Sequence, residues 1–342
     1  MAKKNYAVIG FYGYRENQLD GQTIKTRCLK DTLEDIVEAP IYSLDTGDSR
    51  KKPIRILLKI VYAFLRYQRI YILPNINGLK YLLPVYHWLS AVTRTEVEYV
   101  VIGGWLYSFL QKNPNLLKHF YFLKTIHVET VKMVQDLSTI PNLTINHLPN
   151  FRHFKAGVFT GKRIKANSGL KCLFLARVRR DKGIEICIDA VNSLLDQGAN
   201  ISLDIYGGIE ESYSDAFYSK IKGNKNILYK DCIDPFADDF YTVINQYDVL
   251  VLPTYYEGEG FPGTFLDAFI AGLPIVASDW KYNAQLVEHE KTGLIIKPKS
   301  SDSLVDALDR LIRNPDTFAE LSQNAIQESY NYHAETLIRG IL

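Results

Sequence analysis

Short apolar runs alternate with longer segments of helical periodicity along the whole chain, and this alternation limits the possible folds more than any other feature. Runs of strand length such as 6–12, 69–74 and 97–103 are separated by stretches such as 22–33 and 79–93, whose apolar residues recur every three or four positions. This pattern is typical of parallel sheets covered by helices. The sequence therefore predicts an α/β fold throughout.

The length of the chain indicates two such domains. A chain of 342 residues, of which 47% are hydrophobic, exceeds the usual size of one domain and suffices for two cores. The polar, basic segment 151–168 interrupts the alternation. We expect an N-terminal domain over 1–155, a linker over 156–168 and a second domain over 169–325. The segment 326–342 is expected to pack back onto the first domain as a helix.

Cysteine usage and hydropathy bear on the compartment. The four cysteines lie far apart without a CxxC pair, which favours buried thiols in a reducing compartment over a zinc cluster or a disulfide framework. The N-terminal apolar run is too short for the core of a signal peptide, and no stretch reaches the roughly 18 uninterrupted apolar residues that a spanning helix needs. We expect a cytoplasmic protein.

Charge is distributed unevenly between the two halves. Residues 1–165 carry 24 Lys and Arg against 12 Asp and Glu, whereas residues 166–342 carry 16 against 26, although the net charge is only +2. A basic half favours contact with an anionic surface or substrate, such as phospholipid headgroups, lipid pyrophosphate or nucleic acid. An ordinary solvated surface is the alternative.

The segment 51–69 combines apolar residues at helical spacing with several cations. A basic amphipathic helix of this kind can lie on the anionic inner face of a membrane. Alternatively, its apolar stripe packs on the sheet and only the cations are free. The apolar residues are Ile54, Leu57, Leu58, Val61, Phe64 and Leu65, and the cations are Lys52, Arg55, Lys59, Arg66 and Arg69.

Two strand-to-helix junctions are candidate phosphate sites, because helix N-termini present N–H groups at the carboxyl edge of a parallel sheet. Gly21 opens a helix after the first strand, where it either lets backbone amides approach a diphosphate or forms a plain turn. Arg177 and Lys182 follow the run 171–178. Two cations there can neutralise a nucleotide diphosphate and stabilise it as a leaving group without a metal ion. The alternative is a basic loop before a helix.

A third junction lies within 248–279 and is the densest. Seven residues separate Glu259 from Asp267, and the glycines and proline between them mark a tight loop that leads into a helix. A carboxylate in the loop can face a bound sugar, while one a turn into the helix can accept hydrogen bonds from ribose hydroxyls. The backbone amides available to a phosphate are those of Gly260, Gly263 and Thr264.

The stretch EGFPGTFLDAFIAGLPIVASD resembles the Glu-x7-Glu motif of retaining glycosyltransferase family four (glycosyl transferases group 1), with Glu259 at the first glutamate position and Asp267 at the second. The upstream LARVRRDKGIEICIDAV is similar to the family's diphosphate-binding segment and places Arg177 and Lys182 on its cationic pair. The resemblance is strong over 170–298 and looser before. It implies the GT-B fold, two Rossmann-like domains facing across a cleft, with the nucleotide sugar in the second. It also implies catalysis without a metal ion and retention at the anomeric carbon.

Further segments carry the resemblance. DIYGG resembles the family's glycine loop under the nucleotide, LPNFRHF its closing strand of the first domain, and IGGWL lies where the family has an acceptor-side loop. Asp267 departs from the family's glutamate, and IGGWL lacks the family's histidine. The candidate catalytic residues are thus Glu259, Arg177 and Lys182; the candidate donor contacts are Gly21, Arg177, Lys182, Gly207, Ile233, Glu259, Gly260, Phe261, Gly263, Thr264 and Asp267; the acceptor-side candidates are Gly103, Gly104 and Trp105; and no metal ligand is expected.

The sequence therefore predicts a hexosyltransferase that moves a sugar from a UDP-sugar, or else a GDP-sugar, to a lipid-linked saccharide in capsule, exopolysaccharide or lipopolysaccharide assembly. No cofactor and no nucleic-acid partner are expected. A nucleotide-sugar epimerase and a non-catalytic partner subunit of the same fold remain alternatives. A nicotinamide dehydrogenase is disfavoured, because no GxGxxG follows the first strand.

Overall fold

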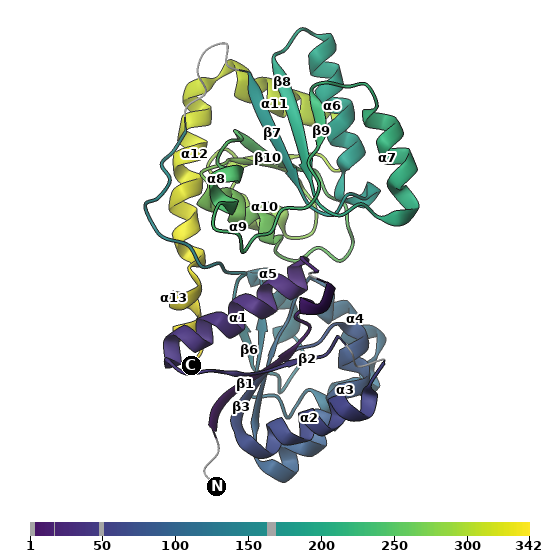
Figure 1. Cartoon of the computed structure of the whole chain (residues 1–342), viewed down its shortest axis with the longest axis vertical. Helices are drawn as coiled ribbons and strands as arrows, with labels where there is room; N and C mark the ends of the chain where they lie inside the picture. The colour runs from purple at the N-terminus through teal and green to yellow at the C-terminus, as the bar shows by residue number, and fades with distance from the viewer. Residues whose placement is uncertain (1–3, 17, 48–50, 163–168) are drawn as a thin grey trace. The chain divides into compact units, whose positions relative to one another are not determined.

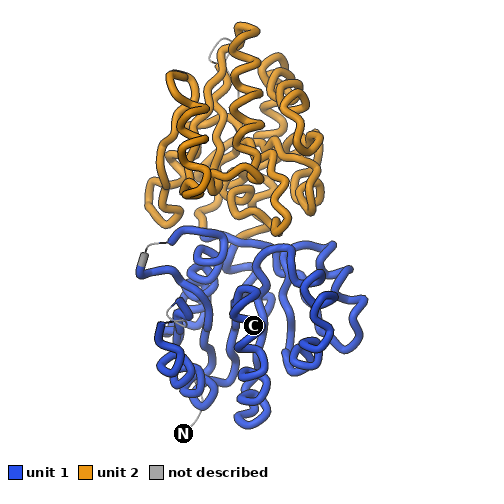
Figure 2. The backbone as a smooth tube through the Cα atoms, turned by 90° about the vertical axis from the view of Figure 1, so that its right-hand side faces the viewer, with its two compact units in different colours: residues 1–153, 334–342 blue, residues 154–333 orange. Residues whose placement is uncertain are grey.

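The computed structural model describes residues 4–16, 18–47, 51–162 and 169–342. It divides the chain into two compact units, coloured separately in Figure 2. Unit 1 comprises residues 1–153 and 334–342, and unit 2 comprises residues 154–333. No helix in the described ranges is long and apolar enough to cross a bilayer.

The described part of unit 1 is built on a six-stranded parallel sheet with helices on it (Figure 1). Its strands are β1 (Lys4–Gly10), β2 (Tyr42–Asp45), β3 (Tyr67–Leu73), β4 (Glu96–Val100), β5 (Thr125–Val128) and β6 (Ile145–His147). Its helices are α1 (Gly21–Val37), α2 (Pro53–Arg66), α3 (Ile76–Thr93), α4 (Leu106–Lys112), α5 (Val131–Ser138) and α13 (Ala334–Arg339), with 3-10 turns η1 (Tyr14–Glu16) and η2 (Pro114–His119).

The strand order in unit 1 is β2-β1-β3-β4-β5-β6. The chain adds β2 on one side of β1 and β3 on the other, so the loops after β1 and β3 diverge at the carboxyl edge of the sheet. The strand β2 was missing from the predicted elements, because it is a four-residue edge strand in which only Leu44 is fully buried. The segment 148–154, which resembles a closing strand, follows β6 instead of forming a strand.

Unit 2, as far as it is described, has a second six-stranded parallel sheet, so the α/β prediction is confirmed. Its strands are β7 (Leu170–Leu175), β8 (Ile201–Tyr206), β9 (Ile227–Tyr229), β10 (Val249–Leu252), β11 (Ile275–Ser278) and β12 (Gly293–Ile296). Its helices are α6 (Ile184–Asp196), α7 (Ser214–Ile221), α8 (Phe240–Ile244), α9 (Gly263–Ile270), α10 (Asn283–Leu286), α11 (Ser301–Arg313) and α12 (Pro315–Ser329), with 3-10 turns η3 (Arg180–Lys182), η4 (Glu211–Tyr213) and η5 (Tyr330–Tyr332).

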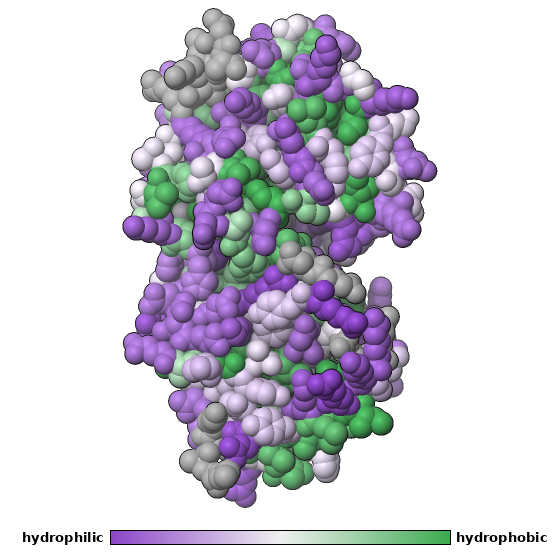
Figure 3. Space-filling model, in the orientation of Figure 1, coloured by the Kyte–Doolittle hydropathy of each residue, from purple (hydrophilic) through white to green (hydrophobic). Residues whose placement is uncertain are grey.

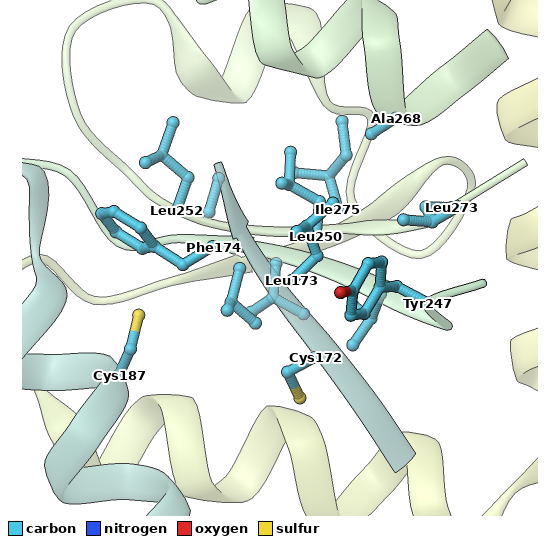
Figure 4. Packing of buried hydrophobic residues seen from close by; sticks show 14 of the residues in the cluster. Cys172, Leu173, Phe174, Cys187, Tyr247, Leu250, Leu252, Ala268, Leu273 and Ile275 are labelled. Carbon is cyan, nitrogen blue, oxygen red and sulfur yellow. The ribbon is translucent and has the colours of Figure 1, made fainter. Parts of the chain in front are cut away.

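The strand order β12-β11-β10-β7-β8-β9 again reverses at the first strand of the unit, between β7 and β10. The centre of this sheet is fully apolar: Leu250 lies opposite Leu173 of β7 and opposite Ile275 of β11. Figure 4 shows these three side chains in the buried cluster of unit 2, to which Phe174 and Ala268 of α9 also belong. The core thus fixes the two strands whose loops carry the candidate site.

Cys28, Cys172 and Cys187 are buried, as expected from the sequence. Cys232 is exposed, which corrects the expectation of four buried thiols. The reason is its place in the loop after β9, where its amide donates to Asp231 Oδ1 at 2.8 Å.

The C-terminal segment joins unit 1 at residue 334, later than the predicted residue 326. Helix α12 stays with unit 2, where it packs on α9 and Ser322 Oγ accepts a hydrogen bond from the amide of Lys162 at 2.7 Å. Only α13 packs on α1, and the amide of Ala334 donates to the carbonyl of Arg152 at 3.0 Å. Residues 154–162 also belong to unit 2, whereas 154–155 were predicted in the first domain and 156–162 as linker. Residues 163–168 of that linker lie outside the described ranges.

Candidate functional site

The reversal of strand order in unit 2 brings Lys182 and Glu259 together. Lys182 ends η3 after β7, and Glu259 lies in the loop after β10, 77 residues later. The Nζ atom of Lys182 lies 2.9 Å from Oε1 and 2.7 Å from Oε2 of Glu259. The side chain of Glu259 is 6% exposed and that of Lys182 is 16% exposed. Two residues predicted separately from the sequence therefore form one nearly buried ion pair at the carboxyl edge of the sheet.

The carboxylate of Glu259 is held in place by residues that follow β10 and β11. The hydroxyl of Thr254 donates to Glu259 Oε2 at 2.8 Å. The carbonyl of Thr254 accepts from Ser278 Oγ, and Trp280 Nε1 donates to the carbonyl of Tyr256 at 2.8 Å. Since these partners are backbone or buried groups, the loop presents Glu259 in a defined orientation.

The ring of Tyr256 lies beside the cations of the site. Lys182 Nζ is 4.7 Å from the ring centroid, and the guanidinium of Arg179 is 5.2 Å from it. Arg179 Nη2 also donates to Asp181 Oδ2 at 2.7 Å. An aromatic face stabilises cations held over it, so Tyr256 helps to gather positive charge at this point. Arg177 lies two residues after the end of β7, and its side chain is exposed.

Sequence reasoning missed Thr254 and Tyr256. The only signal was their position in PTYYEGEG, immediately after a buried strand and before the glycines. Polar residues after a strand are equally typical of an ordinary turn.

Helix α9 supplies the other predicted donor contacts. It begins at Gly263 after Pro262, and no side chain caps its N-terminus. The hydroxyl of Thr264 is buried and has no hydrogen-bond partner among the described residues. An uncapped helix start beside a buried hydroxyl and the amides of Gly260 and Gly263 suits an anionic ligand.

Two predicted donor residues on this segment are more buried than expected. Asp267 is 4% exposed, and Tyr241 Oη donates to its Oδ1 at 3.3 Å. Phe261 is also 4% exposed, and its ring packs edge-on against Tyr332 at 5.1 Å between centroids. The side chain of Phe261 therefore belongs to the core, and only its backbone can face a ligand.

Glycines allow close backbone approach around the loop after β7. Gly207 has φ +136°, and a Cβ atom there would lie 2.0 Å from the carbonyl oxygen of Ala176. Gly183 has φ +81°, and a Cβ atom there would lie 2.3 Å from the carbonyl oxygen of Pro253. Both positions require glycine, so the loops of β7, β8 and β10 pack with almost no space between their backbones.

Ile233 lies half-buried in the loop after β9.

Replacing Gly207 by alanine should lower the melting temperature and weaken nucleotide binding, because the added Cβ must displace the backbone at Ala176, next to Arg177. Gly198→Ala is the matched control: Gly198 also has a positive φ, +84°, but a Cβ there meets nothing within 4 Å. Differential scanning fluorimetry with and without UDP measures both effects. If both variants lose the same melting temperature and the same UDP affinity, backbone strain at positive φ, and not the close contact of Gly207 with Ala176, would explain the losses.

The candidate residues of unit 1 lie at the carboxyl edge of its sheet. Gly103 has φ +84°, and its amide donates to Glu129 Oε2 at 3.1 Å. Gly104 follows, and Trp105 Nε1 donates to the carbonyl of Ile102 at 2.8 Å. The loop with the acceptor-side candidates is thus tied to the buried carboxylate of Glu129 and to its own backbone.

Gly21 opens α1 and is exposed, and a Cβ there would meet nothing within 4 Å. The Asp20 carboxylate caps this helix by accepting from the amides of Gln22 and Thr23, both at 3.0 Å. These two amides already have an acceptor, and a diphosphate contact by Gly21 stays a prediction.

Comparisons with known proteins bear on this geometry. Residues 161–328 match the family described as glycosyl transferases group 1. The chain is 28% identical over 170 residues to the N,N'-diacetylbacillosaminyl-diphospho-undecaprenol alpha-1,3-N-acetylgalactosaminyltransferase of Campylobacter jejuni, covering 50% of this chain and 43% of that protein. It is 24% identical over 168 residues to the capsular polysaccharide biosynthesis glycosyltransferase CapM of Staphylococcus aureus, covering 48% and 42%. The matched stretch thus spans less than half of either relative.

The fold has solved counterparts over its whole length. The crystal structure of Anabaena HepE in complex with UDP-glucose superposes with a TM-score of 0.75 at 16% identity, covering 98% of each chain. Together with the two parallel six-stranded sheets, such neighbours identify the GT-B fold. The predicted fold class is confirmed.

Proposed function

We propose, starting from the glycosyl transferases group 1 domain at residues 161–328 and the GT-B fold, that the chain is a retaining, metal-independent glycosyltransferase of family four. It transfers a hexose from a nucleotide diphosphate sugar, with UDP as the first choice and GDP as the second, to a saccharide acceptor carried on a lipid. The observation that carries this proposal is the contact of Lys182 with Glu259 at the reversal of strand order. The name of CapM supports a place in surface polysaccharide biosynthesis, and the name of the Campylobacter relative supports an acceptor carried on a lipid diphosphate.

In this reaction the bond between the anomeric carbon and the diphosphate breaks, and a bond from the acceptor oxygen forms on the same face of the sugar. The hydroxyl proton of the acceptor passes to the departing phosphate oxygen, so no protein nucleophile is needed. Lys182 and Arg177 compensate the charge that develops on the diphosphate, and the uncapped start of α9 adds N–H donors.

The carboxylates have separate roles in the proposed mechanism. Glu259, held by Thr254 and Lys182, accepts hydrogen bonds from the sugar. Asp267 takes the place of a longer glutamate and is largely buried beneath Tyr241, so it reaches the ribose through a water molecule. The shorter Asp267 also favours the second candidate, a non-catalytic subunit that keeps the fold and binds glycan.

Nucleotide binding tests the proposed function. A ligand that binds only the native state raises the melting temperature, by about 2.7 kcal/mol of stability at 100 times its Kd. Because UDP is the expected donor nucleotide, UDP should raise the melting temperature more than GDP, dTDP or ADP at equal concentration. The shift should be the same in EDTA. Failure of every nucleotide to shift the transition would contradict a donor site, while a shift lost in EDTA would contradict metal independence alone. Turnover of UDP-sugar without acceptor would favour an epimerase.

A further inference from the structure

Helix α2 of unit 1 decides between the two expectations for segment 51–69. The helix ends at Arg66, and Arg69 lies in β3, where its Nε atom is 3.3 Å from Glu96 Oε2. The residues that α2 buries in unit 1 are Ile56, Ile60, Ala63 and Phe64. Of the six residues in the expected apolar stripe, only Phe64 is among them. The stripe therefore does not pack on the sheet.

Four of the remaining stripe residues are exposed, and together with the half-buried Val61 they form an apolar face of α2. They fall at positions 54, 57, 58, 61 and 65, which is the spacing of one side of a helix. Ile54 is 74% exposed, Leu58 is 66% exposed and Leu65 is 58% exposed. Trp88 and Val92 of the neighbouring α3 are also largely exposed. Figure 3 shows hydrophobic residues gathered on the surface of unit 1 over α2 and α3, beside strongly hydrophilic ones.

Three cations at the N-terminal end of α2 form a third face, between the buried face and the apolar face. Lys52, Arg55 and Lys59 follow one another at intervals of three and four residues, so they project from one side of the helix. Among the described residues no carboxylate forms an ion pair with any of them. Outside the protein core, the apolar face of such a helix suits an apolar environment, and its cationic face suits an anionic one.

The cationic face lines a pocket of about 420 Å³ at the carboxyl ends of β1 and β2. The volume is within the range of small-molecule sites, about 300–1,000 Å³. Among the described residues the lining includes one carboxylate, Asp45, whose Oδ1 already accepts from the amides of Tyr12 at 3.3 Å and Gly47 at 2.9 Å. The lysines and arginines of the lining are Arg15, Lys51, Lys52, Arg55 and Lys59.

We propose that this pocket binds the phosphoryl headgroup of a bilayer lipid while the apolar face of α2 contacts the hydrocarbon boundary. Five cations around one amide-bound carboxylate favour an anion with several oxygen acceptors, which a phosphoryl group provides. The adjacent apolar stripe favours a ligand with a hydrocarbon part over a soluble phosphate ester. The inference deepens the proposed function by assigning the lipid side of the acceptor to unit 1, and it rests on that function only for the identity of the acceptor.

Vesicle sedimentation with the full chain tests the proposal. Vesicles of phosphatidylcholine with 30% phosphatidylglycerol or phosphatidic acid should bind the chain, vesicles of phosphatidylcholine alone should not, and high salt should weaken binding. The double variant Arg55→Glu/Lys59→Glu should lower binding at least about tenfold, because each basic residue at an anionic surface contributes about 1 kcal/mol. Leu57→Asp/Leu58→Asp should lower binding to a similar extent while leaving the pocket cations in place.

The matched control is Lys220→Glu/Lys222→Glu, which makes the same charge change on exposed residues at the end of α7 in unit 2 and should bind vesicles like the parent. Equal loss in this control would overturn the proposal, because net charge alone would then govern binding. If the chain binds inorganic pyrophosphate in this pocket but binds none of the vesicles, the pocket would be assigned to a soluble phosphate ester instead. The change in melting temperature with UDP, measured on the same protein, distinguishes the two proposals. A rise with UDP but no vesicle binding would contradict only this inference. Vesicle binding without a rise would contradict only the donor site.

Discussion

Replacing Lys182 by alanine should reduce turnover of a nucleotide sugar by about a hundredfold or more, the effect of losing one donor that stabilises developing charge. The substitution removes the ammonium group that contacts both oxygens of Glu259 and leaves that carboxylate nearly buried without its cation. Steady-state kinetics with radiolabelled UDP-sugar measure the change in kcat and in KM.

The matched control for this prediction is Arg180→Ala. Arg180 lies two residues before Lys182, but its side chain is 66% exposed and its ion-pair partner is Glu185, 3.5 Å away. Turnover of this variant should stay within a few-fold of the parent. A Lys182→Ala enzyme that is as active as the Arg180→Ala enzyme would contradict the proposed role of the ammonium group.

Replacing Lys25 by methionine should lower the free energy of unfolding by about 3–5 kcal/mol, because it breaks a buried ion pair and leaves one charge uncompensated. Lys25 Nζ lies 2.7 Å from Glu129 Oε1, and the two side chains are 1% and 2% exposed. Burial lowers the pKa of Lys25, although the neighbouring Glu129 opposes this shift. Urea denaturation followed by circular dichroism measures the loss.

Two further variants make this second prediction specific. Lys30→Met removes a half-buried lysine of the same helix, which pairs with Glu34, and should cost no more than about 1 kcal/mol. Lys25→Met/Glu129→Leu should recover much of the stability, since an apolar pair replaces the two charges. Similar losses in Lys25→Met and Lys30→Met would show that burial of the pair contributes nothing.

The alternation of apolar runs predicted both sheets because strands buried on two faces are continuous and apolar, as Val249–Leu252 is. The edge strand Tyr42–Asp45 has no such run and was not predictable in this way. The glycines and charges around Lys182 and Glu259 made both residues candidates for the site, and that role stays a prediction. Their contact follows from strand order, which local sequence does not encode.

The remaining differences also have physical causes. From the sequence alone, Phe261 beside the glycines could be a ligand contact or a core residue. Its contact with Tyr332 in the structure shows that it is a core residue. Segment 51–69 carries two apolar stripes, one with Ile56 and Ile60 and one with Ile54 and Leu58. Hydrophobicity alone does not tell which stripe faces the protein, so the exposed face became visible only from the packing of α2.

Unit 1 is discontinuous in sequence, and this has a consequence for its formation during synthesis. Ala334 and Ile338 of α13 complete the same buried cluster as Leu29 and Leu33 of α1, with all of unit 2 between them in the chain. While the ribosome is still translating unit 2, the side of this cluster that Ala334 and Ile338 cover in the finished protein lacks that cover. The buried cluster of unit 1 is therefore completed only after unit 2 has been synthesised.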